Sequence, residues 1–340
     1  MPNESLMAAF ARGREAVAAA RRIVLFTHER ADGDAVGSVA ALQHVLRLEG
    51  RNAHGVLMEH LSSKYAFTAR DEPLLFWGDD GVDDLTKRAD LWILLDTAAQ
   101  KQLAPLAARL QDRTARLLIV DHHATRDIRG DVEIIDETAS ATALLVAEWC
   151  RAEEWALSPT AARLLLMGLA TDTGWFRHAG ADARTFKSAA RLISQGADPS
   201  ALYDQLFLRE PPERFGLFAA VNHAMVLEAG GRLAVLQVTN DLMQRCGATA
   251  GMAEDLVSEP LRIKQVAATV LLTETNTPAI RASFRGKPGV DVARVAESFG
   301  GGGHRLAAGA RLPGPMAAAR EQVVRAMTEA LAQSTREPGG

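Results

Sequence analysis

A short stretch of this sequence combines acidic residues with a histidine at a spacing that could bind a metal ion. Residues 27–38 read T-H-E-R-A-D-G-D-A-V-G-S and follow the apolar run Ile23–Phe26, which predicts a buried strand. His28, Asp32 and Asp34 supply one imidazole and two carboxylates within seven residues, a set that suits a divalent cation. The alternative is an ordinary Asp-Gly-Asp turn beside a loop histidine. This stretch alone leaves both interpretations open.

Further acids and histidines stand where other apolar runs end. Residues 91–95 and 117–120 each run directly into such residues, and an apolar helix pattern over residues 160–170 is followed by an acid. In open parallel sheets, ligands bind beyond the carboxyl ends of the strands, so these side chains should converge at one edge. The residues expected there are His28, Asp32, Asp34, Asp96, Asp121, His122, His123 and Asp172.

The elements that must hold these residues alternate between strand and helix patterns, which predicts a parallel α/β sheet. The expected strands are residues 23–26, 55–58, 91–95, 117–120 and 132–135, with helices at 35–48, 142–152 and 160–170. A helical pattern covers residues 186–228. A second α/β pattern has expected strands at 233–238, 266–273, 279–284 and 310–312, and helices from 240, at 291–299 and up to about 332.

These patterns predict a two-domain α/β protein. We expect a catalytic parallel-sheet domain over residues 1–190, a helical linker over 191–228, a smaller α/β domain over 229–333 and a frayed tail over 334–340.

The amino-acid composition is that of an ordinary globular protein and disfavours several classes of function. The chain has 340 residues, 48% of them apolar, and a net charge of −4, which argues against a large basic surface for nucleic acid. The sequence contains neither an apolar run of membrane-spanning length nor a signal-peptide pattern, so we expect no association with a membrane. Cys150 and Cys246 stand in apolar helical patterns and are expected to be reduced core thiols. A cytoplasmic enzyme fits these features.

The ordered set of motifs resembles the DHH phosphoesterase superfamily. It comprises H-x-x-x-D-x-D with a trailing G-S, the strand-terminal Asp96, D-H-H at 121–123 and T-D-T-G at 171–174. Residues 281–285, R-A-S-F-R, and 290–309, V-D-V-A-R-V-A-E-S-F-G-G-G-G-H-R-L-A-A-G, are similar to the DHH-associated domain of that superfamily. The likeness covers about residues 15–330. It is greatest to the group of bifunctional oligoribonucleases (nanoRNases) and 3′-phosphoadenosine 5′-phosphate phosphatases, which degrade very short RNAs and remove the 3′-phosphate of that nucleotide.

The resemblance implies a pair of divalent metal ions. It assigns His28 and Asp32 to the first metal, Asp34, His122 and Asp172 to the second, and Asp96 to both. It also implies that His123 faces the substrate phosphate and that Asp121 orients a neighbouring histidine. Two departures, Gln100 and Glu137, put substrate detail in doubt but touch no expected ligand.

The donor types support this assignment on physical grounds. Four carboxylates offset the charge of two divalent cations, and such a pair can hold a bridging hydroxide and clamp a phosphoryl group. Oxygen and imidazole donors without thiolate suit Mn²⁺, and less well Mg²⁺, Co²⁺ or Zn²⁺.

The second domain is expected to grip the substrate. Arg281, Ser283 and Arg285 occupy alternate positions of a predicted strand and so share one face, where the arginines could bind a terminal phosphate. A solvated sheet edge is the alternative. The glycines Gly301, Gly302 and Gly303, ahead of His304, could bring backbone N–H groups close to a phosphate, or could form a flexible turn. Closure of this domain over the metals would restrict the enzyme to short substrates.

We therefore expect a metal-dependent phosphoesterase that hydrolyses short oligoribonucleotides and 3′,5′-nucleoside bisphosphates. Its partners would be these substrates, with no membrane, and the sequence leaves a homodimer open. Rival functions are a cyclic di-AMP or pApA phosphodiesterase, a polyphosphatase and, in another class, a non-catalytic nucleotide-binding module. A long-strand exonuclease is less favoured, because no additional nucleic-acid-binding domain is evident.

Overall fold

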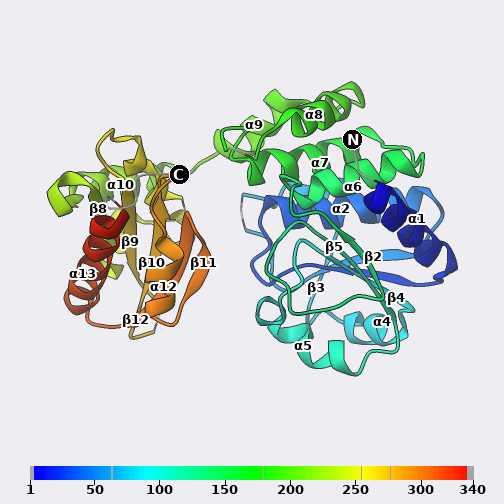
Figure 1. Cartoon of the computed structure of the whole chain (residues 1–340), viewed down its shortest axis with the longest axis horizontal. Coiled ribbons are helices and arrows are strands. Elements are labelled where there is room, and N and C mark those ends of the chain that lie inside the picture. Colours follow the sequence, from blue (N-terminus) through cyan, green and yellow to red (C-terminus); the bar gives the residue numbers. More distant parts are fainter. Residues whose placement is uncertain (1–3, 63, 179, 254, 276, 335–340) are drawn as a thin grey trace. The chain divides into compact units, whose positions relative to one another are not determined.

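Two separate sheets organise the chain, one in each of two structural units, residues 1–209 and 210–340 (Figure 1). The computed structural model describes residues 4–62, 64–178, 180–253, 255–275 and 277–334. The expected two-domain α/β fold is confirmed. Of the expected tail, Ser334 ends the last helix, and residues 335–340 lie outside the described residues.

The first unit contains a six-stranded parallel sheet of order β3-β2-β1-β4-β5-β6. Its strands are β1 Ile23–Phe26, β2 Ala53–Leu57, β3 Leu75–Phe76, β4 Leu91–Leu95, β5 Arg116–Asp121 and β6 Val132–Ile135. Strands β1 and β4 are buried along their whole length, because helices cover both faces of the sheet. The strand order reverses between β1 and β4, and ligands of such sheets bind beyond the strand ends at this reversal.

Helices cover the two faces unequally (Figure 1). One face packs against α1 Glu4–Ala19, α2 Gly33–Leu48, α6 Thr142–Ala152 and α7 Pro159–Asp172. The other packs against α4 Val82–Arg88 and α5 Ala104–Gln111. The short helix α3 Thr68–Asp71 precedes β3, while α8 Ala183–Ser194 and α9 Pro199–Phe207 pack beside α7.

Helices α2 and α7 cross with their backbones close together. A Cβ atom on Gly37 of α2 would lie 2.5 Å from the Leu164 carbonyl oxygen of α7. A Cβ atom on Gly168 of α7 would lie 2.8 Å from Asp34 Oδ1. Only glycine fits at these two positions, so the crossing sets the first turn of α2 beside the last turns of α7. Asp34 and Asp172 belong to those turns.

The second unit has a mixed sheet of order β11-β12-β10-β9-β8-β7. Its elements are α10 Pro212–His223, β7 Val226–Glu228, β8 Leu233–Val238, α11 Asn240–Cys246, β9 Ala268–Glu274, β10 Ala279–Gly286, α12 Val292–Ser298, β11 Gly302–His304, β12 Ala307–Pro313 and α13 Met316–Ser334. Only β8 and β9 are parallel among the strand pairs described. Helices α12 and α13 pack on one face of this sheet.

Three local expectations differ from the structure. The expected linker over residues 191–228 is divided between the units, because α8 and α9 pack on α7 while α10 packs on α11 and β8. Residues 226–228 form strand β7, not helix, because they pair with β8. The glycine run does not remain a loop: residues 302–304 pair with β12 as strand β11.

Both cysteines carry free thiols; Cys150 is buried, as expected of a core thiol, whereas Cys246 is only half-buried. Among the residues that the structure describes, no helix has both the length and the apolar character needed to cross a membrane.

Candidate metal centre

The loop after β1 supplies the first donors. Asp32 caps α2, since its Oδ1 accepts hydrogen bonds from the Asp34 and Ala35 N–H groups at 3.0 and 3.1 Å. An aspartate here satisfies backbone donors that a helix start leaves unpaired. His28 lies between β1 and this cap, with its Nε2 3.5 Å from Asp96 Oδ2. The cap therefore fixes the Asp32 side chain, while His28 contacts Asp96, which follows the neighbouring strand β4.

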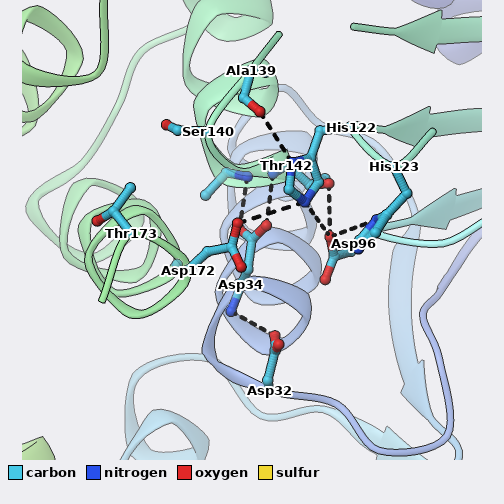
Figure 2. Close-up of polar contacts among 12 residues, drawn as sticks. Asp32, Asp34, Asp96, His122, His123, Ala139, Ser140, Thr142, Asp172 and Thr173 are labelled. Carbon is cyan, nitrogen blue, oxygen red and sulfur yellow. Dashed lines mark hydrogen bonds and ion pairs between the residues drawn. The ribbon is translucent and has the colours of Figure 1, made fainter. Parts of the chain in front are cut away.

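Asp34 lies in the first turn of α2 and is almost fully buried against the start of α6. Its Oδ2 accepts a hydrogen bond from the Thr142 N–H at 2.6 Å, and its Oδ1 accepts one from the Ala143 N–H at 2.8 Å (Figure 2). These groups belong to a helix N-terminus, whose dipole favours a negative charge. Helix α6 thus holds an acid that is 108 residues away in sequence.

Asp96 follows β4 and is 3% exposed. Its φ is +63°, a left-handed conformation that aspartate tolerates better than most residues. Its N–H donates to the Val120 carbonyl at 3.0 Å, and its Oδ1 accepts a hydrogen bond from the Thr142 hydroxyl at 2.9 Å. Such a backbone conformation is typical of functional sites held by their surroundings.

The end of β5 places two histidines next to these acids. His122 donates from Nδ1 to the Ala139 carbonyl at 3.1 Å, and its Nε2 lies 3.6 Å from both Asp96 Oδ1 and Asp172 Oδ2 (Figure 2). His123 Nδ1 lies 2.8 Å from Oδ1 of the buried Asp121. The other carboxylate oxygen of Asp121 is buried without a hydrogen-bond partner among the described residues.

The structure brings all eight expected residues into one neighbourhood. Three sets of donor atoms, each within 4.8 Å of one another, could hold a metal ion. These sets are His28, Asp32 and Asp96; Asp34, His122 and Asp172; and Asp96, His122 and His123. The first two match the two expected ligand sets, and Asp96 lies between them because it contacts both His28 and His122.

The electrostatics of this centre favours the binding of cations. Burial, together with the charges of neighbouring aspartates, raises the pKa of Asp96 well above its ordinary value. Burial and the charges of Asp34 and Asp32 raise the pKa of Asp172 to about 8. Burial lowers the pKa of His28. Acids with such raised pKa values hold a proton at neutral pH unless nearby positive charge stabilises their ionised form, and divalent cations would supply that charge.

His123 differs from the other groups. Burial lowers its pKa, but the hydrogen bond and charge of Asp121 outweigh burial, so the pKa is raised overall. Asp121 therefore keeps Nδ1 of His123 protonated and directs the ring.

Two contributors to this centre were missed in the sequence. Thr142 joins Asp34 and Asp96 through its N–H and hydroxyl, and the Ala139 carbonyl fixes His122. A threonine at the start of an apolar helix pattern suggests only a local cap, so its long-range bonds left no sequence signal.

In the second unit, the expected substrate residues lie on one sheet face. Ile280, Ala282 and Phe284 of β10 enter the core, so the alternating residues between and after them share the opposite face. These are Arg281, Ser283 and Arg285. Strand β11 adds His304, whose register partner Ala307 on β12 is also the partner of Arg285.

The glycine run acts differently from expectation. The Gly300 and Gly301 N–H groups donate to the Glu297 and Ala296 carbonyls at 2.9 and 2.8 Å, and so end helix α12. The Gly301 N–H is therefore not available for a phosphate. Gly303 has a φ of +145° and lies against β12, where a Cβ atom would come within 2.6 Å of Ala308 Cα. Close strand packing explains the glycine at this position.

Family comparisons agree with this geometry. Residues 22–169 match the DHH family, N-terminal domain, and residues 230–334 match the DHHA1 domain. Both expected motif groups are therefore present in their expected halves of the chain.

Individual relatives extend the match over most of the chain. The bifunctional oligoribonuclease and PAP phosphatase NrnA of Bacillus subtilis is 31% identical over 300 residues, covering 85% of this chain and 89% of the relative. The enzyme of the same name from Thermus thermophilus is 30% identical over 315 residues, covering 92% and 91%. An exopolyphosphatase-related protein from Bacteroides fragilis has a crystal structure that superposes with a TM-score of 0.91 at 24% identity, covering 96% of this chain and 98% of that one. This last likeness concerns the fold.

Proposed function

Because the chain belongs to the DHH family of phosphoesterases, which hydrolyse phosphoester bonds, we propose that it degrades very short oligoribonucleotides and removes the 3′-phosphate of 3′-phosphoadenosine 5′-phosphate. The observation that carries the proposal is the pair of donor sets that meet at Asp96. The names of the Bacillus and Thermus relatives support the choice of substrates.

Two divalent ions fit the donors, and Mn²⁺ suits their mixture of carboxylate and imidazole best. His28 and Asp32 would hold one ion, Asp34, His122 and Asp172 the other, and Asp96 both. When bound, such a pair acidifies a water molecule and neutralises charge on the phosphoryl oxygens.

The remaining residues of the centre act on the substrate and on geometry. Asp121 holds Nδ1 of His123, which leaves Nε2 as the ring nitrogen that would reach a phosphate oxygen or the leaving oxygen. Thr142 and the start of α6 fix Asp34 and Asp96 before any substrate arrives.

The second unit would bind a terminal phosphate. Arg285 and His304 share the register partner Ala307, so they lie on neighbouring rows of one sheet face. Ser283 lies two positions along β10 from Arg285, and its partner on β12 is Gly309, which has no side chain to cover this face. Arginine suits a terminal phosphate because its planar guanidinium can donate two parallel hydrogen bonds.

A substrate panel tests the proposal. Metal-stripped protein with added Mn²⁺ would be given ribodinucleotides of varied base composition, a 20-nucleotide RNA, 3′-phosphoadenosine 5′-phosphate, cyclic di-AMP, pApA and polyphosphate. We expect turnover of all the dinucleotides and of the bisphosphate, and much slower cleavage of the 20-mer. The Asp96→Asn variant and a metal-free reaction serve as controls.

The panel also separates the rivals. Turnover restricted to pApA or cyclic di-AMP would replace the proposal by a signalling-nucleotide phosphodiesterase. Binding of dinucleotides without any turnover in Mn²⁺ would indicate a non-catalytic module.

A further inference from the structure

A tight turn beside the candidate metal centre determines how His122 is oriented. Asp136 Oδ1 accepts hydrogen bonds from the Thr138 N–H at 2.9 Å and the Thr138 hydroxyl at 2.6 Å. The Ala139 N–H donates to the Asp136 carbonyl at 3.0 Å. This turn presents the Ala139 carbonyl to His122 Nδ1 at 3.1 Å (Figure 2). Residues 136–139 are called the His122 turn below.

The hydrogen bond to Ala139 fixes one tautomer of His122. A carbonyl oxygen only accepts, so Nδ1 must carry a proton, and in the neutral ring Nε2 then presents its lone pair. That lone pair is directed between Asp96 and Asp172, each 3.6 Å from Nε2. A shift of the His122 turn would release Nδ1 and allow the proton to move to Nε2, where it would block a cation.

An arginine from helix α8 holds the His122 turn. Arg184 Nη1 donates to Asp136 Oδ2 at 2.6 Å, while Thr138 uses the other oxygen of that carboxylate. The rest of the guanidinium forks onto Glu148 of α6, with Nε 2.9 Å from Oε1. The side chains of Arg184, Asp136 and Glu148 are 15%, 16% and 9% exposed, so solvent screens these pairs weakly.

A second ion pair, weaker than that of Arg184, also contacts the His122 turn. Arg126 Nη2 donates to Glu137 Oε1 at 2.9 Å, but the Glu137 side chain is 51% exposed. Exposed ion pairs contribute little, because water screens them and the side chains lose freedom. Glu137 is therefore a matched acidic neighbour for comparison with Asp136.

We propose that Arg184 is a positioning residue that, through Asp136 and the His122 turn, keeps His122 in the tautomer able to bind metal. The inference rests on the proposed function in that it takes His122 as a metal ligand. The side chain of Arg184 binds Asp136 and Glu148, neither of which is an expected metal ligand. Its guanidinium binds Glu148 of α6 through two nitrogens and Asp136 of the turn through the third, a forked geometry that the single nitrogen of lysine does not reproduce.

The first test measures the His122 tautomer directly in metal-free protein. Long-range ¹H–¹⁵N spectra at pH 8, with the His122 signals assigned from a His122→Gln variant, report which ring nitrogen carries the proton. We expect the Nδ1–H form in the wild type, and a population moved toward Nε2–H in Arg184→Lys and Asp136→Asn. Arg191→Lys, an exposed site on the same helix, and Glu137→Gln should keep the wild-type spectrum.

The second test measures Mn²⁺ affinity by electron paramagnetic resonance. Arg184→Lys and Asp136→Asn should each weaken binding about ten- to a hundredfold, the range seen when a partner of a ligating histidine is lost. The double variant should bind no more weakly than the poorer single variant, because both act through one turn. A general loss of stability would instead accumulate in the double variant.

The outcomes separate this inference from the proposed function. Unchanged His122 tautomer populations in both single variants would overturn the positioning role, whatever the enzyme hydrolyses. A shifted tautomer in a protein that cleaves no oligoribonucleotide would leave the positioning role intact and refute the function. Should Arg184→Lys fail to fold, Asp136→Asn still decides the question, since it leaves the Arg184–Glu148 pair in place.

Discussion

Without metal, the carboxylates of the candidate centre should make the first unit less stable as pH rises. The pKa of Asp172 is raised to about 8 in the folded protein, against an ordinary value of 3.8. Between these values the folded state holds a proton that the unfolded chain has lost. Its stability contribution is therefore present at low pH and is lost as pH rises toward 8.

The size of this effect follows from the same shift. Each pH unit between about 5 and 8 can cost at most about 1.4 kcal/mol, or about 4 kcal/mol in total. The Asp172 side chain is 30% exposed, and solvent screening reduces the expected loss to about 2 kcal/mol. In urea this corresponds to a fall of about 1 M in the unfolding midpoint.

Tryptophan fluorescence is a suitable assay, because all five tryptophans belong to the first unit. They are Trp77, Trp92, Trp149, Trp155 and Trp175. Urea unfolding in EDTA at several pH values from 5.5 to 8.5 would be compared between the wild type and Asp172→Asn. Asp84→Asn, an exposed acid on α4, is the matched control.

The comparison with Asp172→Asn separates the contribution of Asp172 to the pH dependence of stability from the contributions of other titrating residues. The pKa of His28 is lowered by burial, so that residue contributes stability in the opposite sense, rising with pH through its ordinary range. We expect the wild type to lose stability relative to Asp172→Asn as pH rises, and Mn²⁺ to restore it most strongly near pH 8. Parallel pH profiles of these two proteins would refute the reasoning.

Three further variants test other parts of the site. Asp96→Asn keeps the left-handed backbone accessible but removes the charge between the two donor sets, and should lower kcat at least a thousandfold in a Mn²⁺ assay; a loss below tenfold would contradict its shared role. Gly168→Ala places a Cβ atom 2.8 Å from Asp34 Oδ1, and should destabilise the first unit by about 1–3 kcal/mol in urea, whereas Gly180→Ala, with 3.8 Å to its nearest atom, should not; equal midpoints would contradict the close helix crossing. Arg285→Ala should raise KM for 3′-phosphoadenosine 5′-phosphate more than it lowers kcat, while the exposed Arg294→Ala should change neither; an unaltered KM for Arg285→Ala would remove it from the substrate site.

Five of the six strands of the first sheet and the expected donor residues were predictable because their signals are local, whereas the two-residue strand β3 was not expected. An apolar run that ends in an acid or histidine predicts a strand, and it also predicts that the acid or histidine lies at the carboxyl edge of the sheet. Strands β4 and β6 have the expected bounds. The parallel order then brings these edges together without further information.

Features that depend on contacts between distant segments were not predictable. The hydrogen bonds of Thr142 to Asp34, the close approach at Gly168 and the ion pairs of Arg184 join residues that no short pattern connects. Strand β7 was missed because its three residues are strand only through pairing with β8. The local structure of the glycine run was not predictable for a related reason, since helix termination and close strand packing require glycine as much as phosphate binding does.

The most direct measurement of the central claim is the number of Mn²⁺ ions that the metal-stripped protein binds. Free Mn²⁺ has a strong paramagnetic resonance signal, so a titration counts the bound ions per chain. Two ions per chain in the wild type, with Asp96→Asn binding weakly at both positions, would agree with donor sets that share one aspartate. Binding of one ion or none by the folded wild-type protein would contradict the account.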